Sequence, residues 1–168
     1  VDRINGFIPV GTLTGAPWQA SIRTFTLDAG HDAIFIGDLV HWDADGYLDQ
    51  YDAGDTQVVG VCVGVEVNRG LSALTEHPGY LDTNVVGKIR VATDPDLLME
   101  VQEDGDTTPL VLADLNRNIE IINAGGSTTT GVSGMEIDST SNNTTNTLPL
   151  RLIALVDRPD NQLASVDS

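Results

Sequence analysis

The segment Val58-Val59-Gly60-Val61-Cys62-Val63-Gly64-Val65-Glu66-Val67 decides the fold class of this chain. It is almost continuous in valine, whose β-branched side chain favours strands. An apolar run without polar alternation is typical of a strand that is buried on both faces. Glycines inside such a strand indicate a β-bulge or a close approach of another backbone, here at Gly60 and Gly64. We therefore expect a central β-strand over residues 58–67.

Shorter strands, separated by turn residues, flank this segment on both sides. Residues 21–27 alternate polar and apolar side chains, which is typical of a half-buried strand. The run Asp43-Ala44-Asp45-Gly46 favours a hairpin turn, because Gly accepts positive φ. Further strands are expected over residues 34–42, 85–92, 97–102, 119–122, 135–138 and 148–156, with short helical turns near 72–76 and 110–115. Many short strands without strand–helix alternation predict an all-β fold, a small β-barrel or β-sandwich.

The composition narrows both the fold and the possible partners. The chain has 168 residues and 40% hydrophobic residues, which suits one packed domain. Aspartates number 19 against 6 glutamates, a bias towards turns rather than helices. The net charge of −17 argues against binding to nucleic acid and to anionic membrane surfaces. No apolar run has the length of a membrane span, and the N-terminus shows no secretory signal, so we expect no export by one.

The first residues of the chain form a candidate interaction segment. Glycine and proline are too frequent in residues 1–19 for a helix, yet the segment is rich in large apolar side chains. We expect an extended N-terminal arm over 1–19, a single β-rich domain over 20–160 and a loose tail over 161–168. The alternative is that the arm is simply the first strand of the domain. The candidate contact residues of the arm are Phe7, Ile8, Val10, Leu13 and Trp18.

No convincing catalytic site emerges from the sequence. In the run 131–135 the second glycine comes one place too early for a nucleophile elbow around Ser133, and a polar loop surrounds the run. Cys62 lies inside the valine segment, where burial makes a thiol unreactive, and a single cysteine excludes a disulfide framework. His31, His41 and His77 are too far apart in sequence for a local metal motif. We expect a protein that is not an enzyme and needs no cofactor.

An aspartate-rich segment over residues 43–55 raises the question of a calcium site. Several carboxylates on one loop are the ligands that hard cations prefer. The segment lacks the glycine at position six and the glutamate at position twelve of an EF-hand loop. Because the aspartates occupy two turns, turn formation alone explains them, and we favour that interpretation.

Several glycine–aspartate motifs recur in a fixed order along the chain. They are Gly37-Asp38-Leu39-Val40, Asp45-Gly46-Tyr47, Ala53-Gly54-Asp55 and the segment 59–66, with further matches in residues 6–15, 94–104, 125–131 and 152–161. This ordered set resembles the capsid decoration, or cement, proteins of tailed bacteriophages, in particular a branch found among aquatic and marine phages. The likeness spans nearly the whole chain, although no single motif is specific.

The resemblance implies a β-rich, non-enzymatic structural protein of the virion. Such proteins bind the major capsid protein on the outer surface of the icosahedral head, often as homotrimers, after synthesis in the host cytoplasm. The family pattern supplies no catalytic residues. The alternative function is a carbohydrate- or host-surface-binding β module of a virion fibre, with an aromatic platform. That platform would consist of Trp18, Trp42, Tyr47 and Tyr51.

Overall fold

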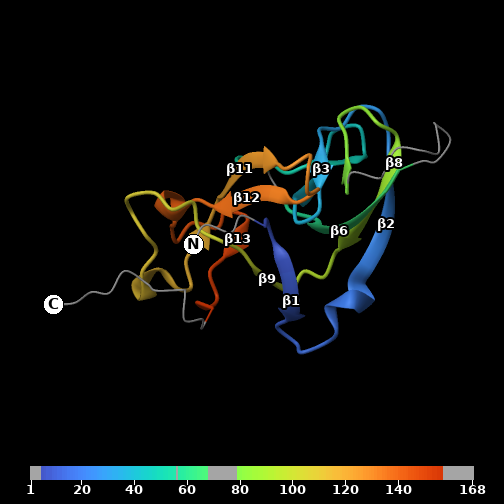
Figure 1. Cartoon of the computed structure of the whole chain (residues 1–168). Coiled ribbons are helices and arrows are strands. Elements are labelled where there is room, and N and C mark those ends of the chain that lie inside the picture. The colour runs from blue at the N-terminus through green and yellow to red at the C-terminus, as the bar shows by residue number, and fades with distance from the viewer. Residues whose placement is uncertain (1–4, 56, 68–78, 157–168) are drawn as a thin grey trace.

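The computed structural model describes residues 5–55, 57–67 and 79–156 as an antiparallel β-protein (Figure 1). Helical structure within these ranges is limited to three 3-10 turns, η1 (Trp18–Ser21), η2 (Leu112–Asp114) and η3 (Ser139–Ser141). The prediction of an all-β fold is therefore confirmed.

The largest unit is a five-stranded antiparallel sheet in the order β2-β8-β6-β4-β5. Its strands are β2 (Ile22–Leu27), β4 (Leu39–Trp42), β5 (Leu48–Gln50), β6 (Gly60–Val67) and β8 (Gly87–Ala92). The sheet curls, so that the outer strands β2 and β5 lie near each other. The rings of Phe25 and Trp42, from β2 and β4, also meet edge to face with centroids 5.8 Å apart. We call this unit the barrel.

Four antiparallel strand pairs complete the fold. They are β1 (Ile8–Thr12) with β9 (Leu97–Glu100), β3 (Ile34–Phe35) with β7 (Tyr80–Leu81), β10 (Asn118–Ile119) with β13 (Leu150–Arg151), and β11 (Ile121–Gly126) with β12 (Ser133–Ile137). In Figure 1, β2, β6 and β8 lie on one side of the molecule and β11, β12 and β13 on the other, with β1 and β9 between them.

The valine segment separates two hydrophobic cores, as expected for a strand buried on both faces. Val61 of β6 packs into a core with Leu39, whereas the next residue, Cys62, packs into a second core with Val40. The first core joins the outside of the barrel to the C-terminal strands, and its buried members are Phe7, Leu39, Tyr51, Val61, Ala92, Leu110, Ile119, Ile121, Met135 and Ile137. The second core fills the barrel with Leu27, Ile34, Val40, Leu48, Cys62, Leu81, Ile89 and Val91.

Gly60 and Gly64 lie at a close backbone approach and at a β-bulge, the two features that glycines in a strand indicate. A Cβ atom on Gly60 would overlap with the carbonyl oxygen of Ala92 in β8, so only glycine permits this backbone approach. The pairing of β6 with β8 shifts register between Cys62 and Gly64, which is a β-bulge. The bulge changes the alternation, and Val65 consequently packs with the barrel core on the same side as Cys62.

The C-terminal strand is much shorter than expected. Only Leu150–Arg151 of the predicted range 148–156 pairs as a strand, with Asn118–Ile119. Asn116, two residues before the partner strand, adopts a positive φ of 71°, outside the extended region. The helix expected over 110–115 is reduced to the turn η2. The helical turn expected at 72–76 and the tail at 161–168 lie outside the described residues.

Candidate functional site

The N-terminal segment is hydrogen-bonded to the domain along most of its described length. Strand β1 pairs with β9, the backbone N–H of Phe7 donates to the carbonyl of Gly37 at 2.8 Å, and that of Leu13 donates to Asp96 at 2.9 Å. Residues 8–12 thus form a strand of the domain, as in the alternative interpretation of the arm.

The five candidate residues of this segment divide into two groups. Phe7 is 2% exposed and belongs to the core, and the half-buried Trp18 packs against that core. Ile8, Val10 and Leu13 remain 45%, 55% and 59% exposed. These three are the exposed members of the set, and we call them together the β1 face.

Acidic side chains border the β1 face. Glu100 lies directly across the β1–β9 pair from Ile8, and cross-strand partners share a side of the sheet. The exposed Asp96 lies close to Leu13, whose N–H donates to the backbone carbonyl of Asp96 at 2.9 Å. An apolar strip with an acidic border fits a protein surface that is apolar at its centre and basic at its rim.

The backbone edge of β1 is poorly suited to accept an additional strand. Pro9 has no N–H to donate, and the register shifts between Pro9 and Gly11. Proline and bulges are the features that protect edge strands against pairing with other chains. The side chains of the β1 face, rather than its backbone, are therefore the groups that can bind.

The aromatic platform of the alternative function is not assembled on the surface. Tyr51 is fully buried in the core, so its ring is not presented to solvent, and Trp18 is half-buried against that core. Trp42 and Tyr47 are 51% and 41% exposed. Part of the Trp42 ring surface is covered by the edge contact with Phe25.

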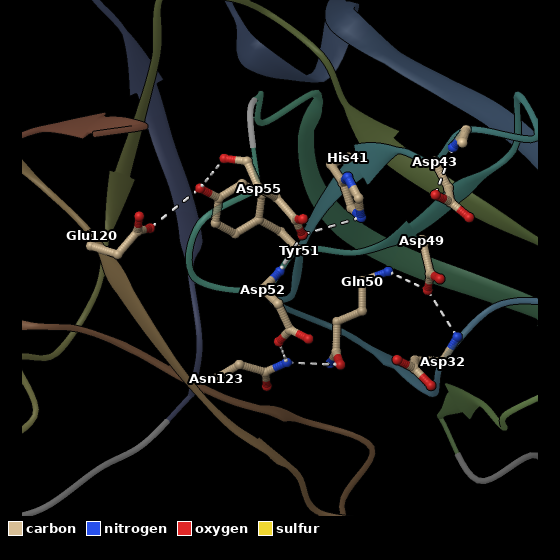
Figure 2. Close-up of polar contacts among 11 residues, drawn as sticks. Asp32, His41, Asp43, Asp49, Gln50, Tyr51, Asp52, Asp55, Glu120 and Asn123 are labelled. Atoms are coloured by element: carbon tan, nitrogen blue, oxygen red, sulfur yellow. Dashed lines mark hydrogen bonds and ion pairs between the residues drawn. The ribbon is translucent and has the colours of Figure 1, made fainter. Parts of the chain in front are cut away.

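The aspartates of residues 43–55 form hydrogen bonds within turns and across loops (Figure 2). Asp43 accepts from the backbone N–H of Ala44, and Asp49 accepts from the N–H of Asp32. Asp45 accepts from the backbone N–H of Tyr47. Asp52 accepts from the amide of Asn123 at 2.6 Å. Among the described residues, no three carboxylate, histidine or cysteine groups gather as a metal site. This arrangement supports the interpretation of the segment as turn chemistry.

Tyr51 connects the β5 end of this segment to the C-terminal half. Its hydroxyl lies 2.9 Å from the carbonyl of Asp55 and 3.3 Å from the carboxylate of Glu120 (Figure 2). Burial, followed by the negative charge of Glu120, raises the pKa of Tyr51 above its ordinary value. The carboxylate of Asp55 also lies 3.3 Å from the imidazole of His41. These contacts tie three parts of the fold together.

The candidate nucleophiles are structural. Cys62 is 1% exposed, and burial raises the pKa of its thiol to about 12. Ser133 is 2% exposed in β12, where its hydroxyl accepts from the backbone N–H of Met135. His31 is buried and contacts the carbonyl of Val85, and His77 lies outside the described residues.

A buried carboxyl group, Asp38, was not anticipated from the sequence. Asp38 is 0% exposed, and its Oδ2 accepts from the backbone N–H of Phe35 and from the amide of Gln50. In sequence it is one more aspartate after a glycine, and most such residues occupy exposed turns. Its two apolar neighbours, Leu39 and Val40, are the only local sign that this turn enters the core.

Comparisons with protein-family models, curated proteins and solved structures give no match to this chain. No helix in the described part of the chain is long and apolar enough to cross a membrane. The surface geometry and the motif resemblance are therefore the features that bear on function.

Proposed function

We propose that this chain is a virion structural protein, a decoration or cement protein that binds the outer surface of a tailed-phage head. The ordered glycine–aspartate motifs support the proposal through their resemblance to that family. The observation that carries it is the β1 face, an exposed apolar strip with an acidic border on a chain of net charge −17. The proposed partner is the major capsid protein, and no enzymatic step is assigned.

The size of the β1 face favours a multivalent attachment. Covering three large side chains that are about half exposed contributes roughly 1 kcal/mol each. That sum is smaller than the cost of association, which is about 4 kcal/mol or more. One face alone therefore holds a copy weakly, whereas three linked faces bind with a much higher effective affinity. Because linked faces bind more tightly, the small β1 face supports the proposed homotrimer on the head.

The test uses purified heads of the phage that encodes the chain, stripped of the protein and incubated with variants. The variant Ile8→Ser, Val10→Ser, Leu13→Ser removes the β1 face without touching Phe7. The matched control Val86→Ser, Leu112→Ser, Ile153→Ser changes three other side chains, which are 47%, 66% and 48% exposed. We expect the unmodified protein and the control to sediment with heads, and the β1 variant to lose most of its occupancy. Full occupancy of the β1 variant, or absence of the chain from virions, would overturn the proposal.

A further inference from the structure

Asp38 lies where three parts of the fold meet. It follows the turn between β3 and β4, where its Oδ2 accepts from the N–H of Phe35 at 2.8 Å. From β5, the side-chain amide of Gln50 donates to the same oxygen at 2.7 Å. From β12, Ser133 lies beside the carboxyl group. We call Asp38, the Phe35 N–H, Gln50 and Ser133 the junction.

The groups that face Asp38 are neutral. β5 presents the amide of Gln50, and β12 presents the hydroxyl of Ser133 and the thioether of Met135, which accepts from the N–H of Leu39. β6 presents the buried thiol of Cys62, itself an acid that stays protonated at neutral pH. No lysine, arginine or histidine among the described residues forms an ion pair with Asp38. A carboxylate here would be a buried charge without a counter-ion, which is unfavourable.

The two carboxyl oxygens have different surroundings. Oδ2 already accepts two hydrogen bonds, whereas Oδ1 is buried and has no hydrogen bond of standard geometry within the described structure. A neutral carboxylic acid has one acceptor oxygen and one hydroxyl. The remaining polar neighbour of the carboxyl group is the hydroxyl of Ser133, which can accept a hydrogen bond from a proton on Oδ1.

We propose that Asp38 is a neutral carboxylic acid in the folded protein, with its proton on Oδ1. We further propose that its ionisation at higher pH loosens the packing of the junction and the backbone hydrogen bonds beside it. The proposal does not depend on what the β1 face binds. Two backbone hydrogen bonds run beside the junction, from Phe7 N–H to Gly37 at 2.8 Å and from Ser133 N–H to Ile36 at 2.9 Å. They attach the start of β1 and the β11–β12 hairpin to the turn that carries Asp38.

The direction of the pH effect follows from burial. Burial raises the pKa of Asp38 above its ordinary value, and the hydrogen bonds from Ser133, Phe35 and Gln50 only partly oppose the rise. The folded state therefore holds this proton at a pH where the unfolded chain has released it. The stabilisation is complete below the ordinary aspartate pKa and is lost as the pH rises through the raised value. The stabilisation that the proton on Asp38 gives to the junction is consequently greatest at acidic pH.

The first test observes the carboxyl carbon of Asp38 in the unmodified protein by ¹³C nuclear magnetic resonance. We expect its chemical shift to be that of a protonated acid at a pH where the exposed aspartates are ionised, and to move only at higher pH. Titration of Asp38 together with the exposed aspartates would overturn the proposal. This measurement requires no variant, so it stands even if substitutions at the junction impair folding.

The second test compares Asp38→Asn with Asp45→Asn, which makes the same change of charge at an exposed turn. The Asp38→Asn variant keeps an acceptor oxygen for Phe35 and Gln50, and its amide cannot ionise. From mildly acidic to mildly alkaline pH, we expect amide protection of Phe7 and Ser133, corrected for intrinsic exchange, to fall in the unmodified protein and in Asp45→Asn. The same amides should stay protected in Asp38→Asn. An equal fall in all three proteins would contradict the proposal that ionisation of Asp38 loosens the junction.

Discussion

The ring of Phe35 in β3 occupies the space that a side chain at Gly126 would fill. A Cβ atom on Gly126 would overlap with the ring atoms Cγ, Cδ1 and Cδ2 of Phe35. The same ring is stacked on Tyr80 of β7, with centroids 4.8 Å apart and an interplanar angle of 13°. Gly126 ends β11, so this contact joins the C-terminal hairpin to the β3–β7 pair.

We expect Gly126→Ala to destabilise the protein by about 1–3 kcal/mol, because Phe35 is 4% exposed and has little room to move. The measurement is the free energy of unfolding from urea denaturation. Gly11→Ala is the control, since a Cβ there meets nothing within 4 Å. Equal stabilities of the two variants would show that the Phe35 contact is not tight in solution.

Much of the fold could be predicted because the valine segment combines β-branched residues with glycines at two meaningful positions. The hairpin turn at residues 43–46 could also be predicted, since Asp45 and Gly46 have the chemistry that the turn needs. The length of the last strand could not. It depends on pairing with β10, a partner strand that is distant in sequence.

The candidate surface could be predicted only in part. Composition identifies the N-terminal segment as apolar, but it does not distinguish Phe7, which enters the core, from Ile8, which stays exposed. That difference arises from long-range contacts without a local signal, because the N–H of Phe7 bonds to Gly37 whereas Ile8 pairs with Glu100 of β9. Asp38 was missed for the same reason, because its partners Gln50 and Ser133 are distant in sequence.

The split within the N-terminal segment predicts very unequal losses of stability for substitutions at neighbouring positions. Phe7→Ala should cost about 3–5 kcal/mol, because it leaves a cavity in the first core. Ile8→Ala should change stability by about 0.5 kcal/mol or less, since Ile8 is 45% exposed. Chemical denaturation of both variants measures the difference. Similar, small losses would show that the segment is a detachable arm after all.

Tyr51 should make stability sensitive to alkaline pH. Its pKa is raised by burial and then by Glu120, so the folded state retains a proton that the unfolded chain releases near about pH 10. The contribution is complete below that pH and is lost as the pH rises through the raised pKa. We expect the unmodified protein to lose more stability than Tyr51→Phe between about pH 9 and 11.

At neutral pH, Tyr51→Phe should cost about 0.5–1.5 kcal/mol for the lost hydroxyl contacts. Glu120 is not left unpaired, because its Oε1 still accepts from the N–H of Ile121. Tyr47→Phe is the control, since Tyr47 is 41% exposed. If both variants show the same alkaline profile, the buried hydroxyl is not responsible.

Cys62 should be unreactive towards a thiol reagent until the barrel opens. Its side chain lies in the barrel core, and burial raises the pKa of the thiol to about 12, so very little reactive thiolate is present. We expect labelling to be at least about a thousandfold slower than for an exposed thiol, since it requires unfolding. The reference is Ala53→Cys in a Cys62→Ser background, because Ala53 is exposed in a turn. Destabilising the fold by Gly126→Ala should accelerate labelling of Cys62 about tenfold for each 1.4 kcal/mol of lost stability, provided that reclosing is fast. Rapid labelling of the unmodified protein at neutral pH would mean that β6 is not held between two cores in solution.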